Sequence, residues 1–570
     1  MARVRQTVVM VVAVLTMGVG LVGSGGAQQT RTQLRAADVT AIAELLQLDD
    51  TRRFDEPMLT RLLASTHPEV QRRAVVTIGR IPHERGLALL EPLATGADAQ
   101  FHATVAFAMG QVRDPAGVPW LARTMGQWRV NADAAFEAAR ALGKVRTPEA
   151  RGHLERFLQA VPDTPVARVV AGEALLSLGR YTDPGTLDPM LRWITVDDVE
   201  VRWRATWALF RPRNPDAASH LLTLSSDPSA EVRFWAVRGL TPALMSDQRL
   251  GSARLRDALT DPDRRVRTEA LRVLTAYDDD ASVEAVLAAL EDPDTWMSVS
   301  AAETLGRHRD RIAQIAPKLA AASAATQPLA LRLATLSPLA QLAPPLALDA
   351  AGSLLGHPSV HTRTVATQVL RNMGPLGQQR LQAAANDPAL KDLLIAPPAG
   401  RGGGPAAPPA LKDRGLDYYR EVVERWIVPA WNGAPAPRAV WMTPNGEIEL
   451  ELFAADAPLG MEELVRLTES GAIVGTVFTR VVPNFVAQQA TIQGANRLRD
   501  EVNRHGLTRA NLAWASSGLD TGRPGYTLGN TPQPHNEGDF TSLGRVVRGM
   551  EVVDRLELGD TVVAARMVKQ

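Results

Sequence analysis

The residue types best suited to chemistry gather in one short segment, 477–488, toward the C-terminal end of the 570-residue chain. Within it, Arg480 supplies a planar guanidinium that is always charged and can donate hydrogen bonds to a group that gains electron density. Phe485 supplies an apolar surface, and the amide of Gln488 can hydrogen-bond a polypeptide backbone. Together these side chains could bind a ligand that has an apolar part next to a polar group.

The composition of the chain excludes several other kinds of chemistry. Cysteine is absent, which excludes disulfides, thiolate zinc sites, iron–sulfur clusters and thiol catalysis. Lys and Arg number 62, and so do Asp and Glu, so no basic excess attracts nucleic acid or an anionic membrane. His357 and His361 lie four residues apart, but no nearby carboxylate completes a metal site with them. We therefore expect no cofactor, no metal and no nucleic-acid partner.

The elements that must position the first cluster follow a β-type pattern. Residues 447–453 alternate between polar and apolar side chains, and the apolar residues 439–442 lie on the other side of a Pro-Asn-Gly turn, which predicts two strands. Residues 461–470 are expected to form a helix, and 477–482 a further strand. Short strands and glycine turns over about 130 residues favour a closed β-barrel with one or two helices.

Five short motifs follow one another along this part of the chain. They occupy residues 445–453 with 457–458, 477–488, 499–501, 512–515 and 544–554. The second reads VFTRVVPNFVAQ, and the last reads GRVVRGMEVVD. Together and in this order they resemble cyclophilin-type peptidyl-prolyl cis-trans isomerases, whose core motif is F-H-R-x-x-P-x-F-x-x-Q. The resemblance implies a cyclophilin barrel over residues 438–570 and isomerase activity on proline-containing polypeptides.

The resemblance also implies roles for the residues at the matched positions. Amide resonance gives the peptide bond a rotation barrier of about 18–20 kcal/mol. Arg480 would donate to the twisted prolyl bond, Phe485 would receive the proline ring, and Gln488 would hydrogen-bond the substrate backbone. The other positions expected to bind substrate are Val486, Trp514, Ala515, Tyr526, Thr527, Phe540 and Leu543.

The chain departs from the family pattern at part of this pocket. Where the family has G-S-Q-F-F, residues 523–527 read R-P-G-Y-T, so Gly525 replaces a glutamine and Thr527 replaces a phenylalanine of the pocket wall. Phe540 stands where a pocket histidine is frequent, and His535 where a tryptophan or histidine is common. Two hypotheses therefore stay open. One is an active isomerase that assists the folding of exported proteins; the other is a non-catalytic interaction protein whose barrel only holds proline-containing peptides.

The middle of the chain repeats with a period of about 32 residues. The clearest unit, 261–274, follows the pattern Asp-Pro-x-x-x-Val-Arg-x-x-Ala-x-x-x-Leu. We expect its Asp261 to cap a helix and Pro262 to occupy the first helical position. Each unit predicts a helical hairpin with one apolar stripe, to which Trp203, Trp207 and Trp235 contribute core side chains. About ten such units over 65–390 resemble HEAT-like repeats, which implies a solenoid with a concave surface for a protein partner.

The remaining segments complete the predicted organisation. Residues 1–27 carry Arg3 and Arg5, an uncharged run and small residues, which predicts a signal peptide and an exported, periplasmic or secreted protein with no membrane contact after cleavage. Residues 396–412 form a Pro/Gly-rich linker and 413–437 a connecting helix and loop. The predicted architecture is multidomain: an all-α HEAT-like solenoid over 28–395, followed through a flexible tether by a closed β-barrel of cyclophilin type.

Overall fold

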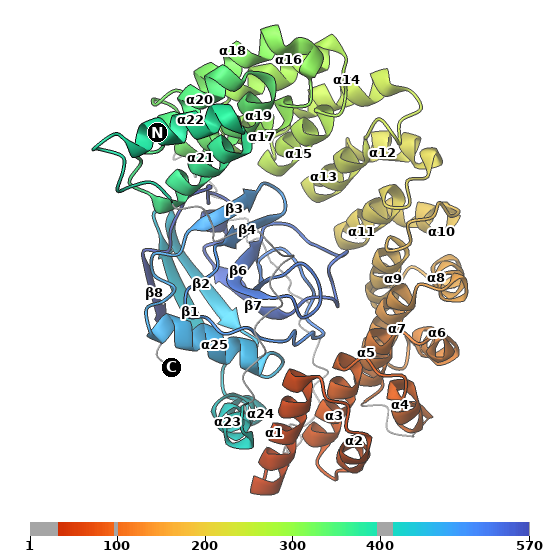
Figure 1. The fold of residues 1–570 in the computed structure, drawn as a ribbon. Helices are drawn as coiled ribbons and strands as arrows, with labels where there is room; N and C mark the ends of the chain where they lie inside the picture. The colour runs from red at the N-terminus through yellow and green to blue at the C-terminus, as the bar shows by residue number, and fades with distance from the viewer. Residues whose placement is uncertain (1–31, 96–100, 396–413, 569–570) are drawn as a thin grey trace, which may run out of the picture.

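The computed structural model describes residues 32–95, 101–395 and 414–568. The predicted signal peptide, 1–27, and the predicted linker, 396–412, lie outside these residues. Across the described ranges, none of the helices is both long enough and apolar enough to cross a membrane. Figure 1 shows an arc of paired helices that curves around a β-domain.

The helices of the arc form two stacked rows. The inner row consists of α1 (Ala36–Thr51), α3 (Pro68–Arg80), α5 (His102–Val112), α7 (Ala132–Val145), α9 (Pro165–Leu178), α11 (Val199–Phe210), α13 (Ala230–Gly239), α15 (Arg264–Leu274), α17 (Thr295–Leu305), α19 (Leu329–Leu342) and α21 (Val360–Asn372). The outer row consists of α2 (Glu56–Leu63), α4 (Gly86–Thr95), α6 (Val118–Gly126), α8 (Pro148–Ala160), α10 (Asp188–Leu191), α12 (Ala218–Leu224), α14 (Gln248–Ala258), α16 (Asp280–Ala288), α18 (Ile312–Ala322), α20 (Pro344–Gly352) and α22 (Pro375–Ala385). This stacking of hairpins is the predicted HEAT-like solenoid, and it begins one hairpin earlier than residue 65.

Tryptophans form part of the solenoid core, as the sequence predicts. Trp203, Trp207 and Trp235 are all buried, and the rings of Trp203 and Trp235 stack with centroids 5.9 Å apart. Because these two rings come from α11 and α13, the stack joins successive repeats.

The repeated Asp-Pro pair was expected to cap the helix of its repeat, and this prediction is wrong, because the N-cap lies two residues later. Helix α15 begins at Arg264, and its N-cap is Asp263, whose carboxylate accepts from the backbone N–H of Arg265. Asp261 instead accepts from the N–H of Asp263, 2.8 Å away, and binds Arg233 of the preceding repeat at 2.8 Å. The pair therefore forms a turn ahead of the helix. Its aspartate is then free to link neighbouring repeats.

The β-domain is a closed antiparallel barrel. Its strands are β1 (Arg438–Thr443), β2 (Gly446–Leu452), β3 (Phe478–Val482), β4 (Val486–Gln489), β5 (Asn511–Ala515), β6 (Arg523–Gly529), β7 (Ser542–Arg548) and β8 (Ala564–Met567), in the order β3-β4-β6-β5-β7-β2-β1-β8. Hydrogen bonds between 475–478 and 559–562 join the β3 edge to the chain that leads into β8. Helix α25 (Pro458–Glu469) packs against the barrel, and a short helix α26 (Met550–Val553) follows β7.

A short helical segment precedes the barrel, as predicted. It consists of α23 (Leu416–Val422), a π-helical turn over Val423–Ile427 and α24 (Val428–Trp431). The segment packs against α1, and the hydroxyl of Tyr419 donates to the buried carboxylate of Asp50 at 2.8 Å. The chain that enters the barrel is thus fixed to the first helix of the solenoid.

The barrel lies inside the arc, against the inner row of helices (Figure 1). Basic side chains of the solenoid donate to backbone carbonyl oxygens of the barrel. The pairs are Arg52 with Asp500 (2.7 Å), Arg73 with Ala455 (2.8 Å), Arg80 with Val502 (2.7 Å), Arg140 with Arg504 (3.0 Å), Lys144 with Gly538 (3.3 Å), Arg180 with Glu537 (3.0 Å) and Arg264 with Asp554 (2.5 Å). The two domains are therefore docked against each other, and the concave surface expected to take a protein partner holds the chain's own barrel.

Candidate functional site

The β3–β4 hairpin brings the three predicted catalytic side chains together. Arg480 of β3 and Gln488 of β4 are cross-strand neighbours, and the Arg480 Nη1 donates to the Gln488 Oε1 at 3.3 Å. The Arg480 guanidinium carbon lies 5.3 Å from the centre of the Phe485 ring. Arg480 is exposed, so its remaining donors can reach a bound molecule.

The turn of this hairpin sets the position of Phe485. Asn484 adopts the left-handed conformation with φ of 59°, which asparagine tolerates better than most residues. The N–H of Phe485 then donates to Val482 at 3.1 Å, and the Phe485 carbonyl accepts from the Gln533 amide at 3.1 Å. The half-buried ring of Phe485 stacks on His535 with centroids 6.2 Å apart.

Thr527 and Gly525 lie beside this trio on the neighbouring strand β6. Thr527 pairs with Gln488 in the sheet, and its hydroxyl donates to the Ala513 carbonyl at 3.3 Å. A Cβ added at Gly525 would lie 2.8 Å from the Ala490 oxygen and 3.0 Å from the Gln489 oxygen. The backbone therefore leaves no room at position 525 for the glutamine that the family carries there.

Several residues expected to bind substrate lie in the barrel core instead. Tyr526 and Leu543 have no exposed surface, and Trp514 is 7% exposed with its ring stacked on Tyr526 at 4.8 Å between centroids. Because these side chains are buried in the core, their direct contact with a substrate stays a prediction. Val486 and Ala515 are also buried, and Phe540 is half-buried.

The solenoid reaches the same hairpin, which the sequence analysis does not anticipate. The Asn484 amide donates to the Arg265 carbonyl at 2.8 Å and to the Glu269 carboxylate at 3.2 Å. Both partners belong to α15, and Glu269 is buried. Asn484 occupies a position that the family motif leaves open, and Glu269 occupies an ordinary helix position of the repeat. Neither residue carries a local signal of this contact.

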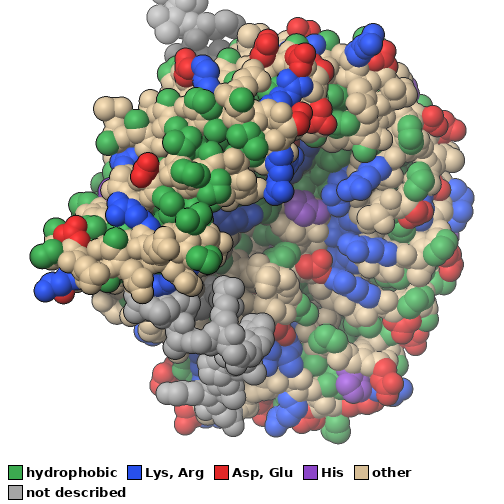
Figure 2. Space-filling model, turned by 45° about the horizontal axis from the view of Figure 1, so that its top comes forward, with side chains coloured by type: hydrophobic (Ala, Val, Ile, Leu, Met, Phe, Trp, Pro, Cys, Tyr) green, Lys and Arg blue, Asp and Glu red, His purple; other side chains and the backbone are tan. Residues whose placement is uncertain are grey.

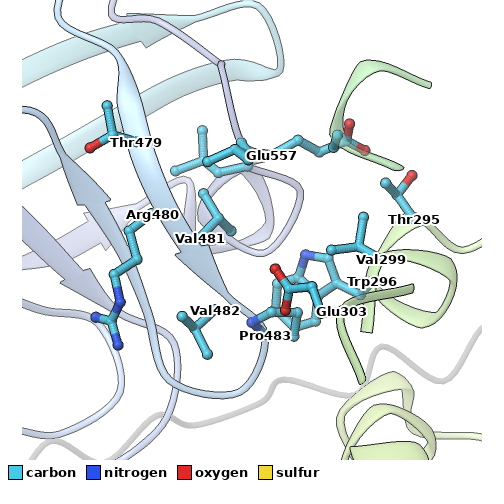
Figure 3. A pocket seen from close by; sticks show the side chains of 13 residues that line it. Thr295, Trp296, Val299, Glu303, Thr479, Arg480, Val481, Val482, Pro483 and Glu557 are labelled. Atoms are coloured by element: carbon cyan, nitrogen blue, oxygen red, sulfur yellow. The ribbon is translucent and has the colours of Figure 1, made fainter. Parts of the chain in front are cut away.

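A cavity of about 270 Å³ separates β3 from α17. Figure 3 shows Trp296, Val299 and Glu303 on the solenoid side, facing Val481 and Pro483 of the barrel. Arg480 is also among the residues that line this cavity, although its guanidinium is directed away from Trp296 in Figure 3. The cavity therefore adjoins the Arg480 site.

Positive charge surrounds the other side of the hairpin. Burial and the charges of Arg211, Arg238 and Arg180 lower the pKa of His535 to about 4. At neutral pH the His535 imidazole is therefore uncharged, and the positive charge near Phe485 comes from arginines of the solenoid.

Comparisons with known proteins agree with both parts of the fold. Residues 439–570 match the model of the cyclophilin type peptidyl-prolyl cis-trans isomerase family, and 167–241 and 252–337 match HEAT repeats. A peptidyl-prolyl cis-trans isomerase of Helicobacter pylori is 33% identical over 21% of this chain and 80% of its own length. One from Synechococcus elongatus is 29% identical over 23% of this chain and 96% of its own length, and isomerase B of Bacillus subtilis is 30% identical over 22% and 92%. The chain belongs to the cyclophilin-type peptidyl-prolyl cis-trans isomerase family, and its isomerase domain is joined to a HEAT-repeat solenoid.

Proposed function

We propose that this protein catalyses cis-trans isomerisation of Xaa-Pro bonds at the β3–β4 hairpin and that it assists the folding of exported proteins. One observation carries the catalytic part: an exposed Arg480 is held by Gln488 and lies over Phe485. The named activity of the relatives in three bacteria supports it. The predicted signal peptide supports the role in export.

The proposed mechanism uses the difference between a planar and a twisted prolyl bond. Twisting breaks amide resonance, so the prolyl nitrogen becomes pyramidal and basic. The Arg480 guanidinium donates to the group that gains electron density, and therefore binds the twisted state better than either planar state. Phe485 offers an apolar surface to the proline ring, and Gln488 keeps the guanidinium oriented.

The position of the solenoid restricts which substrates can enter. Because α15 contacts the tip of the hairpin through Asn484, the approach to Arg480 lies between two surfaces of the same chain. An extended or unfolded segment fits such an approach better than a folded domain does. This favours unfolded polypeptides as clients.

A second function, binding without catalysis, has a specific observation in its favour. Thr527 places a hydroxyl beside Gln488 where the family has an aromatic wall, and Gly525 leaves no side chain beside it. A proline ring held by Phe485 alone on this side would be bound less tightly. The two functions are separated by a measurement of turnover.

The test is an isomerisation assay of the full chain without residues 1–27. Exchange between the cis and trans signals of an Ala-Pro peptide is measured by NMR, with and without the protein. We expect catalysis that Arg480→Ala lowers at least about tenfold, which corresponds to about 1.4 kcal/mol of transition-state stabilisation. Arg497→Ala, which changes another arginine of the barrel, is the control and should retain the rate. Peptide binding with no exchange would establish the non-catalytic function instead.

A further inference from the structure

Two groups of basic residues on the inner helices of the solenoid differ in their partners. The first group, described above, donates to carbonyl oxygens of the barrel. The second group lies at the C-terminal ends of α7, α11 and α13 and consists of Arg146, Arg211, Arg213 and Arg238. Within the described part of the chain, no carboxylate pairs with Arg146, Arg211 or Arg213. We call Arg146, Arg211 and Arg213 the free arginine group; Arg238, which pairs with Glu269, lies beside them.

The free arginine group lies beside the isomerase site. Arg238 Nε is 3.6 Å from the Glu269 carboxylate, and the same carboxylate accepts from Asn484, the residue before Phe485. Arg211 is held by its own donation to the Gly179 carbonyl at 3.3 Å and by the Trp207 ring, 5.3 Å away. The next residue after Gly179, Arg180, donates to Glu537, two positions after the His535 that stacks on Phe485.

Two further observations support an excess of positive charge at this place. Burial together with the charges of Arg211, Arg238 and Arg180 lowers the pKa of His535, so a cation is disfavoured there. Burial and the charges of Arg238, Arg213, Arg146 and Arg180 also lower the pKa of Arg211, so these side chains repel one another. Figure 2 shows Lys and Arg side chains gathered along the rim of a hollow in the molecule.

A molecule that brings negative charge would relieve the mutual repulsion of these arginines. Arg146 and Arg213 are exposed, and Arg211 and Arg238 are half-buried, so these side chains are accessible from solvent. By contrast, the α17 side of the same hairpin carries Glu303, an acidic side chain. Glu303 thus distinguishes the α17 side of the hairpin from the side that the arginines flank.

We propose that the free arginine group selects client segments in which aspartate or glutamate lies within a few residues of the proline. The proposal rests on the proposed function, because it describes what accompanies the Xaa-Pro bond into the Arg480 site. The solenoid thereby acts as one wall of the substrate groove and determines its charge preference. A bare cyclophilin barrel lacks this wall.

The test compares three fluorescent peptides that share one Ala-Pro pair and carry flanking Glu, Gln or Lys residues on both sides. Their dissociation constants for the full chain without residues 1–27 are measured by fluorescence anisotropy. We expect the Glu peptide to bind about three- to tenfold more tightly than the Lys peptide, the range that one or two partly exposed charge pairs supply. The preference should shrink in 0.5 M salt, which screens such pairs.

The variants assign the preference to the free arginine group. Arg211→Gln with Arg213→Asn should bring the Glu and Lys peptides to nearly equal affinity, and Arg211→Glu with Arg213→Asp should reverse their order. Asn and Asp are chosen at 213 because its φ of 54° is left-handed. The matched control is Arg123→Gln with Arg249→Gln, which removes two exposed arginines from the outer helices α6 and α14 and should leave the preference unchanged.

A reversal of preference identifies charge recognition, since a merely structural loss would weaken all three peptides alike. Equal affinity of the wild-type chain for the Glu and Lys peptides would overturn the proposal, as would a preference that the Arg211 and Arg213 variants leave intact. The proposed isomerase function is judged separately by NMR exchange with the Gln peptide. If the protein leaves the cis-trans exchange rate of the Gln peptide unchanged, catalysis is refuted. The comparison of dissociation constants would still decide whether the protein prefers acidic peptides.

Discussion

Asn484 of the barrel donates to Glu269 of the solenoid, with 3.2 Å between the Asn484 Nδ2 and the Glu269 Oε2. The contact joins residues 215 positions apart and lies one residue before Phe485. Arg272 forms a salt bridge with the same carboxylate at 2.8 Å. The acceptor of the Asn484 hydrogen bond is therefore held in place by a residue of its own helix. The tip of the isomerase hairpin is therefore anchored to the solenoid and not free in solvent.

Removing this anchor should loosen the hairpin without unfolding the barrel. Asn484→Ala is expected to cost about 1 kcal/mol, the usual net value of a hydrogen bond. Hydrogen–deuterium exchange should rise at residues 478–489 and at α15, with little change elsewhere. Asn386→Ala, at an exposed position after α22, is the control. Unchanged exchange at 478–489 would show that the contact does not hold the hairpin.

Cutting the chain between the two domains should not separate them. Arg80, Arg140 and Arg180 are buried donors to barrel carbonyls, so their contacts persist without a covalent link. With a protease site introduced between residues 400 and 405, the two fragments should elute together in size-exclusion chromatography. The triple variant Arg80→Gln, Arg140→Gln and Arg180→Gln should elute as two species after the same cut. Separation of the wild-type fragments would contradict the observed docking.

The stability of the folded protein should depend on pH because of the buried Lys144 side chain. Burial, with the charges of Arg180 and Arg140, lowers its pKa to about 7, whereas the unfolded chain has the usual value near 10.4. Between these values the unfolded state binds more protons, so the stability of the wild type rises with pH from about 7 to 10. Lys144→Met removes this contribution.

The variant should therefore gain most in melting temperature, relative to wild type, at pH 6 and least at pH 9.5. Differential scanning calorimetry at the two pH values measures the difference. Lys391→Met, at an exposed position, serves as the control and should show no such trend. An equal change in melting temperature at both pH values would mean that Lys144 keeps its charge in the folded protein.

Gly525 is expected to be intolerant of any side chain. A methyl group there would approach the Ala490 oxygen to 2.8 Å and the Gln489 oxygen to 3.0 Å, so strands β4 and β6 must move apart. Gly525→Ala should destabilise the protein by about 1–3 kcal/mol, as overpacking does. Gly522→Ala is the matched control, because its added methyl would meet nothing closer than 3.9 Å. Urea unfolding of both variants measures the difference, and equal midpoints would contradict the close approach.

Local patterns in the sequence determined the elements of both domains. The strand at 446–452 follows apolar–polar alternation, those at 438–443 and 478–482 follow short apolar runs beside turns, and the solenoid helices follow the repeated apolar stripe. These patterns are reliable because each reflects which face of one element is buried against its neighbours. The spacing in 477–488 likewise sufficed to bring Arg480, Phe485 and Gln488 together, since one hairpin holds all three.

Only the tertiary structure decided how the two domains meet. The acceptors for Arg80, Arg140 and Arg180 are backbone carbonyl oxygens more than 350 residues away, and every residue type has such an oxygen. Because any residue type can supply such a backbone acceptor, the sequence contains no pattern that predicts the contact. The inward placement of Tyr526 and Leu543 depends in the same way on the twist and closure of the whole barrel. The sequence by itself therefore determined the two folds and the proximity of Arg480, Phe485 and Gln488, while the docking of the barrel, and with it the surroundings of Arg480, required the folded chain.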